Sequence, residues 1–109
     1  MSVDFEALRK RAAQCPNGEA ILRECASLAE MLIEKNIAYG DSALNPVRVF
    51  SRGMDASAQI LVRIDDKLSR IARIKCLGSA AGEDAVLDLL GYLVLYRIAT
   101  VRETAQAQP

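Results

Sequence analysis

The hydrophobic pattern is densest over residues 83–99, EDAVLDLLGYLVLYRIA, where Asp88 and Arg97 are the only charged positions after Asp84. A helix that is apolar on every side is normally a buried one. The pattern therefore predicts a buried helix over residues 82–102, followed by a disordered tail over 103–109.

Three further segments show apolar residues at helical spacing, which predicts helices over residues 3–14, 18–36 and 56–76. The sequence Cys15-Pro16-Asn17-Gly18 separates the first two as a turn, and residues 35–46 form a loop rich in turn-forming residues. Asp55 is placed to cap the third helix, whose expected buried stripe comprises Ile60, Leu61, Ile64, Leu68, Ile71 and Ile74.

Four helices without a convincing strand predict an all-α protein, with one four-helix bundle-like domain over residues 1–109. The last helix is too apolar for one small bundle to cover. We therefore expect a homo-oligomer that associates through this C-terminal helix, a dimer being the simplest case.

A polar stripe runs along this apolar helix, because Asp84, Asp88 and Tyr92 follow one another at intervals of four residues. A buried carboxylate is costly unless it is paired, hydrogen-bonded or bound to a metal. Asp88 therefore requires a partner. If that partner is a ligand or a metal, Asp88→Ala should abolish binding at little cost in stability.

The amino-acid composition limits the kinds of ligand and metal that this protein is expected to bind. Fourteen basic residues balance fourteen acidic ones, which argues against non-specific binding of DNA or RNA. The apolar run at 85–96 is too short to span a bilayer, and no secretory pattern opens the chain, so we expect a soluble, cytoplasmic protein. Without histidine, and with three cysteines that lack CxxC spacing, any bound metal should be a hard ion held by carboxylates, Mg²⁺ or Mn²⁺.

Two charged segments allow both a functional and a structural interpretation. Glu30 and Glu34 lie one turn apart and could share a ligand, or could simply belong to a solvated helix face. The segment RIDDKLSR could be a salt-bridged surface helix, with Arg63, Asp66, Arg70 and Arg73 on its far side. Alternatively, Asp65 and Lys67 could reach into a cleft between helices.

Three blocks in order, EKNIAYGDS at 34–42, VRIDDKLSRI at 62–71 and EDAVLDLLGYLVL at 83–95, resemble the nucleotide-modification-associated domain family of bacteria and phages. That family is related to the all-α NTP pyrophosphatases of the MazG and dimeric dUTPase group. The resemblance implies Mg²⁺-dependent cleavage of a nucleoside triphosphate to a monophosphate and pyrophosphate. It implies metal ligands at Glu30, Glu34, Asp84 and Asp88, with catalytic roles for Asp88, Asp84 and Glu34. It also implies phosphate contacts from Lys35, Lys67 and Arg70, and further substrate contacts from Asn36, Tyr39, Ser42 and Tyr92.

The chain departs from the family pattern at several acidic positions. Ala38 stands where an acid is expected, Ala80 or Ala81 replaces a glutamate before Asp84, and Glu30 and Glu34 are four residues apart rather than three. Two alternatives to an enzyme therefore stay open. One is an oligomer that binds a nucleotide, or sequesters a cyclic-nucleotide immune signal, through Lys35, Arg48, Arg52, Lys67 and Arg70. The other is a structural oligomer in which Asp84 and Asp88 cap the helix and pair with Lys67 or Arg63.

Overall fold

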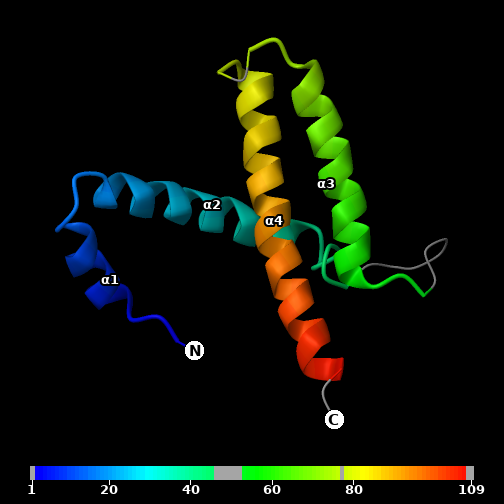
Figure 1. The fold of residues 1–109 in the computed structure, drawn as a ribbon, viewed down its shortest axis with the longest axis horizontal. Helices are drawn as coiled ribbons and strands as arrows, with labels where there is room; N and C mark the ends of the chain where they lie inside the picture. Colours follow the sequence, from blue (N-terminus) through cyan, green and yellow to red (C-terminus); the bar gives the residue numbers. More distant parts are fainter. Residues whose placement is uncertain (1, 46–52, 77, 108–109) are drawn as a thin grey trace. The chain divides into compact units, whose positions relative to one another are not determined.

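The computed structural model describes residues 2–45, 53–76 and 78–107. These residues form four helices and no strand: α1 (Phe5–Ala12), α2 (Gly18–Ala38), α3 (Ala56–Arg73) and α4 (Ala80–Ala107) (Figure 1). The predicted all-α class is confirmed. Arg48 and Arg52, assigned above to ligand binding, lie outside the described residues.

The helix ends differ from the predicted ones. The first helix is shorter, because the Asp4 side chain caps it by accepting the Ala7 N–H at 3.1 Å. The third ends at Arg73, because Ile74 is already extended with ψ 124°. The fourth runs to Ala107, through most of the segment that the sequence predicted as a disordered tail.

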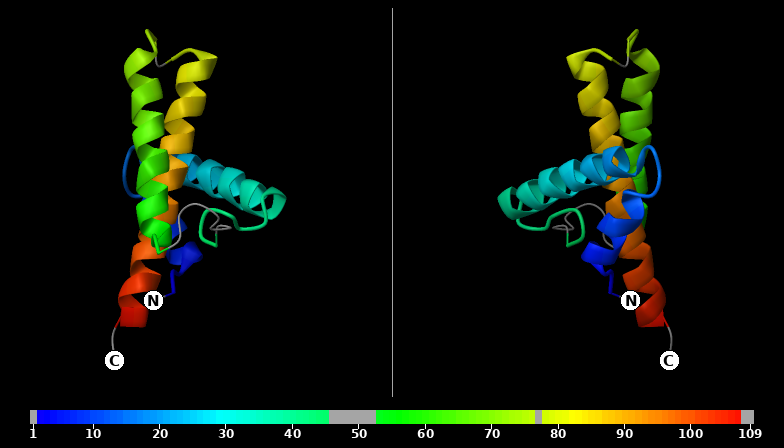
Figure 2. Two further views of the ribbon diagram at one scale, coloured as in Figure 1. Left: turned by 90° about the vertical axis from the view of Figure 1, so that its right-hand side faces the viewer. Right: turned by 90° about the vertical axis from the view of Figure 1, so that its left-hand side faces the viewer.

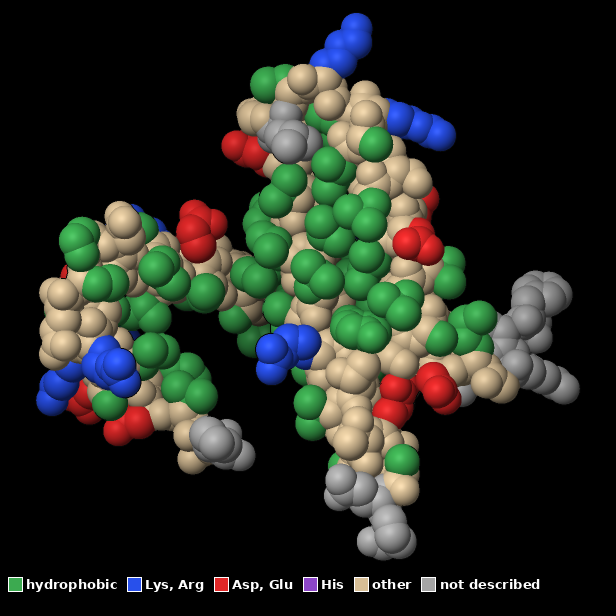
Figure 3. Space-filling model, viewed as in Figure 1, with side chains coloured by type: hydrophobic (Ala, Val, Ile, Leu, Met, Phe, Trp, Pro, Cys, Tyr) green, Lys and Arg blue, Asp and Glu red, His purple; other side chains and the backbone are tan. Residues whose placement is uncertain are grey.

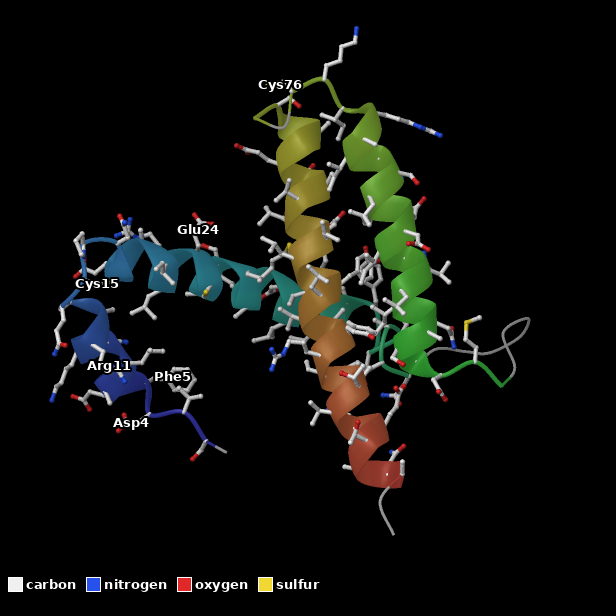
Figure 4. All side chains as sticks on the ribbon, viewed as in Figure 1. Asp4, Phe5, Arg11, Cys15, Glu24 and Cys76 are labelled. Carbon is white, nitrogen blue, oxygen red and sulfur yellow. The ribbon has the colours of Figure 1, made fainter. Side chains whose placement is uncertain are left out.

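The chain divides into two compact units, Met1–Glu34 and Lys35–Pro109, and the boundary falls inside α2. The first unit contains α1 and most of α2, joined by a tight turn. Ala12 and Gly18, at either end of that turn, are both buried. A Cβ at position 18 would collide with the Ala12 carbonyl group, so the close approach of the two helix ends requires glycine. Figure 4 shows Cys15 at this turn.

In the second unit α3 and α4 pack side by side and antiparallel (Figures 1 and 2). The core of this pair is a cluster of Ile60, Ile64 and Ala99, and partly buried side chains pack around it: Leu44, Ala56, Leu89, Tyr92, Leu95 and Tyr96. This packing of α3 against α4 is the part of the expected bundle that the structure establishes. A single bundle of all four helices stays a prediction.

The end of α2 is joined to this core by a tight reversal of the chain. Gly40 and Asp41 both adopt left-handed backbone conformations, with φ of 62° and 63°, and the Asp41 N–H donates to the Asn36 carbonyl at 3.1 Å. This six-to-one bond is the Schellman arrangement that closes many helices at a glycine. The reversal leads directly to Leu44, which packs against the α3–α4 core.

The expected distribution of buried residues is only partly correct. Ile60 and Ile64 are buried, whereas Leu61 and Leu68 of the predicted stripe are exposed. Within one copy of the chain the fourth helix is not covered on every side, because Leu90, Leu93, Val94 and Val101 are exposed, and burial of these residues in an oligomer stays a prediction. Among the described residues, the part of α4 that packs into the α3–α4 core is the side bearing Leu89, Tyr92, Leu95, Tyr96 and Ala99.

The N-terminus of α3 is satisfied by a residue from the far end of α4. Asp55 occupies the predicted cap position, but its side chain makes no capping hydrogen bond. Instead the Glu103 carboxylate accepts the Ser57 N–H at 3.1 Å and the Ser57 hydroxyl at 2.6 Å. This negative charge lies at the positive end of the α3 dipole, where it is favourable.

Candidate functional site: a lysine-bound aspartate beside an arginine-lined groove

Asp88 on α4 is the centre of the charged cluster in the second unit. The Lys35 ammonium group, from the last turn of α2, donates to its Oδ1 at 2.9 Å. The Lys67 ammonium group, from α3, lies 3.4 Å from Oδ2. The partner that the sequence required for Asp88 is therefore a pair of lysines from two other helices.

The three side chains differ in their contact with solvent. Lys67 retains 14 % of its exposed surface, Asp88 25 % and Lys35 49 %. Lys67 is the innermost member, and its charge needs a counter-ion most because desolvation costs are largest there. The Asp88–Lys67 pairing agrees with the structural interpretation of the sequence, which the Asp88–Lys35 pairing extends.

The environment shifts the pKa values of Asp88 and Lys35 in opposite directions. Partial burial acts to raise the pKa of Asp88, but the hydrogen bond and charge of Lys35, followed by those of Lys67, outweigh it, so the net shift is downward. The hydrogen bond to Asp88 raises the pKa of Lys35 against the opposing effect of burial, and the nearby groups of Tyr39 and Tyr92 add to the increase. Asp88 and Lys35 are thus both held in their charged forms.

An open groove of about 360 Å³ lies beside this cluster, between the end of α3 and the start of α4. Arg70, Arg73 and Ile74 line one side, and Ala81, Asp84, Ala85 and Asp88 line the other. Alanine at positions 81 and 85 leaves room between the two helices. Because Asp84 and Asp88 are one helical turn apart, both carboxylates lie along the same wall.

Arg73 is a member of the groove that the sequence did not single out. The sequence does contain a pattern that could have indicated Arg73, because basic residues recur every three positions at Lys67, Arg70 and Arg73. The helical spacing placed Arg70 and Arg73 on the far side of the third helix, although the family resemblance implied a phosphate contact for Arg70. That placement is wrong, because both side chains line the groove with Asp84 and Asp88.

The other predicted site residues are placed as follows. Asn36, Tyr39 and Ser42 are exposed at and after the end of α2. Glu30 and Glu34 are exposed on the part of α2 that belongs to the first unit. No group of three or more His, Cys, Asp or Glu side chains that could hold a metal occurs among the described residues. The four-acid ligand set stays a prediction of the family resemblance.

Comparisons with protein families, with curated proteins and with solved structures give no match for this chain. Within the described parts of the chain, no helix is both long enough and apolar enough to cross a membrane.

Proposed function

We propose that this chain binds a phosphorylated ligand, of the nucleotide class, in the groove between α3 and α4. The observation that carries the proposal is the convergence of basic side chains on this groove. Arg70 and Arg73 line it, and Lys67 and Lys35 meet at Asp88 on its edge. Four basic side chains are thus gathered around two acidic ones, Asp84 and Asp88.

The arginines suit phosphate recognition. A guanidinium group presents several N–H donors in a plane and can bind two phosphate oxygens at once. Arg70 and Arg73 are both exposed, so a ligand can reach them without opening the α3–α4 core. Asp88 has a positioning role, because it fixes the ammonium groups of Lys35 and Lys67 beside the groove.

The geometry favours binding without cleavage. Both carboxylate oxygens of Asp88 already have a lysine partner, and a magnesium ion would have to compete with those two cations for them. The chain would then bind a linear or cyclic nucleotide and release it unchanged. This is the alternative left open by the sequence, an oligomer that sequesters a nucleotide or a cyclic-nucleotide immune signal.

A second candidate function, Mg²⁺-dependent pyrophosphohydrolysis, is favoured by one specific observation. Asp84 and Asp88 line the same wall and face Arg70 and Arg73 across the groove. These carboxylates fit a hard cation, and the arginines fit the phosphates that such a cation bridges. When bound, Mg²⁺ would neutralise charge on the phosphates and position a water molecule. Asp84, Asp88 and the arginines would hold and orient the triphosphate.

Titration calorimetry with a panel of nucleoside triphosphates and cyclic dinucleotides, each with and without Mg²⁺, tests the proposal. We expect binding that the double variant Arg70→Ala/Arg73→Ala weakens at least about tenfold, the loss of roughly 1.4 kcal/mol. Arg63→Ala is the matched control, because Arg63 lies seven residues before Arg70 on the same helix, is exposed and does not line the groove. Failure of every ligand to bind in either condition would refute ligand binding.

Chromatography of the recovered ligand separates the two functions. Recovery of the ligand unchanged would show that the protein binds it without hydrolysis. Conversion to a monophosphate and pyrophosphate that requires Mg²⁺ identifies the enzyme, and Asp84→Asn should then abolish turnover. Mass spectrometry of small molecules that co-purify with the protein would name the ligand directly.

We further propose that the protein acts as a homo-oligomer associating through α4. The support is the row of exposed apolar side chains on that helix, which includes Leu90, Leu93, Val94 and Val101. Contiguous exposed apolar surface of this kind marks interaction sites in soluble proteins.

A further inference from the structure

α4 carries a second apolar face, opposite the one that packs against α3. Leu89, Tyr92, Tyr96 and Ala99 belong to the α3–α4 core. Leu90, Val94 and Val101 follow one another at intervals of four and seven residues, and so they share the other side of the helix. Leu90 and Leu93 retain 43 % of their surface and Val101 65 %. Hydrophobic side chains extend along α4 in Figure 3.

Two opposite charges lie at equal distances from the middle of this second face. Glu83 precedes Leu90 by seven residues and Arg97 follows it by seven. Seven residues are close to two helical turns, so both charges lie on the same face as Leu90, each about 10.5 Å along the axis. Both are exposed, and no ion pair involving either side chain is formed within the described part of the chain.

We infer that this face binds the same face of a second copy of the chain, with the two α4 helices antiparallel and a two-fold axis at Leu90. In this register each residue of α4 lies opposite the partner residue for which the two residue numbers add up to 180. Glu83 therefore meets the partner's Arg97, Arg97 meets the partner's Glu83, and Leu90 meets the partner's Leu90. The inference rests on the self-association proposed above and is independent of ligand binding.

The charge pattern selects both the partner and the direction. An interface with two-fold symmetry brings one surface against itself, so the surface must be complementary to its own image. Along α4 this face carries first an acidic residue, Glu83, then the apolar centre at Leu90, and then a basic residue, Arg97. Such an order is complementary to its own image only when the two helices are antiparallel. A parallel, in-register pair would place Glu83 against the partner's Glu83 and Arg97 against the partner's Arg97.

The apolar and charged residues have separate roles in this dimer. Burial of Leu90, Val94 and their neighbours supplies the driving force. The two ion pairs at the margins are solvent-accessible, and such pairs contribute mainly to register and specificity. Charge reversal therefore tests the register without removing the apolar surface that drives association.

Sedimentation of charge-reversed variants gives the first test. Glu83→Arg places arginine against the partner's Arg97, and Arg97→Glu places glutamate against the partner's Glu83. We expect each single variant to dimerise at least about tenfold more weakly than the parent chain. The double variant Glu83→Arg/Arg97→Glu should recover parent-like dimerisation, and so should an equimolar mixture of the two single variants.

Each single variant dimerises weakly when measured alone. Recovery in the mixture must therefore come from contacts between the two different chains and not from a local effect within one helix. Single variants that dimerise like the parent, or a double variant as weak as the singles, would overturn the antiparallel register. In either case the chain would still be shown to dimerise, and nucleotide binding, measured on the same samples, would be judged separately.

Disulfide cross-linking gives the second test, in a background where Cys15, Cys25 and Cys76 are replaced by serine because all three native thiols are free and exposed. Leu90→Cys places two thiols at the two-fold axis. Mild oxidation by a copper–phenanthroline catalyst and dioxygen should couple them into one disulfide, with loss of two protons and two electrons. Val101→Cys is the matched control, because eleven residues from the axis leave its two copies about 33 Å apart.

A covalent dimer of Leu90→Cys, without one of Val101→Cys, is the result expected. Equal cross-linking of both variants, or of neither, would overturn the register. A sedimentation mass of 11.9 kDa at every concentration would refute self-association altogether. The face would then belong to an interface with a different protein.

Discussion

The carboxylate of Asp88 binds the ammonium group of Lys35 at 2.9 Å, across 53 positions of the sequence. Because Lys35 belongs to the last turn of α2, the bond joins the end of that helix to the third turn of α4. Lys67 reaches the same carboxylate from α3. One aspartate thus connects three helices and borders the groove.

Asp88→Asn should destabilise the protein by roughly 1 kcal/mol, because it leaves the nearly buried Lys67 without a counter-ion. The sequence-based expectation was that removing Asp88 would cost little stability, because it assumed that the carboxylate was buried without a charged partner. The two lysine partners overturn that assumption. Lys67→Met keeps the apolar part of the side chain and should cost less, and Lys35→Met should change stability by only a few tenths of a kcal/mol. Urea unfolding monitored by circular dichroism measures all three. An Asp88→Asn variant as stable as the parent would contradict this order.

The same cluster should stabilise the protein over a defined pH range. The pKa of Asp88 lies below its usual 3.8, so its contribution is complete above that value and is lost as the pH falls through the lowered pKa. The pKa of Lys35 lies above its usual 10.5, so its contribution is complete below that value and is lost as the pH rises through the raised pKa. The stability difference between the parent and Asp88→Asn should therefore be largest at pH 5–9 and shrink at both extremes. A difference that is constant between pH 2 and 7 would contradict the ionised pair.

Glu103→Ala should destabilise the α3–α4 pair by about 1 kcal/mol, because the Ser57 N–H and hydroxyl lose their acceptor. Asp55→Ala is the control at the same helix end. Asp55 occupies the cap position without a side-chain capping bond, so its replacement should cost no more than about 0.5 kcal/mol. Thermal unfolding of the two variants compares them directly. A larger loss for Asp55→Ala would show that the assignment of the cap to Glu103 is mistaken.

Gly18→Ala should disrupt the turn between α1 and α2, because the added Cβ meets the backbone of Ala12 and the two helix ends must separate. Overpacking of this kind typically costs 1–3 kcal/mol. Gly78→Ala is the control, since a Cβ there would meet only the Cys76 sulfur, at an ordinary 3.8 Å. Hydrogen exchange should show faster exchange in α1 and the start of α2 for Gly18→Ala alone. Equal protection in both variants would mean that the turn accommodates a Cβ at position 18 without separating the two helix ends.

The helices of this fold could be predicted because their signals are local. The apolar spacing of Ile60 and Ile64, and the turn at Cys15–Gly18, are readable within a few residues. The end of α4 could not be predicted, because Glu103 contributes through Ser57, a residue 46 positions away. A polar segment such as TAQAQP gives no sign of that contact.

The candidate site was predictable to a similar, limited degree. The stripe of Asp84 and Asp88 showed that a carboxylate on an apolar helix needs a partner. The identity of that partner depends on how the end of α2 meets α4, which involves the reversal at Gly40–Asp41 and the packing of Leu44. Arg73 was missed because the face of α3 on which it lies becomes part of a groove only when α4 is present.

The boundary between the two units falls within a continuous helix rather than within a flexible linker. Lys35 is the first residue of the second unit, so its hydrogen bond to Asp88 lies wholly within that unit. The bond therefore marks the point along α2 at which the second unit begins.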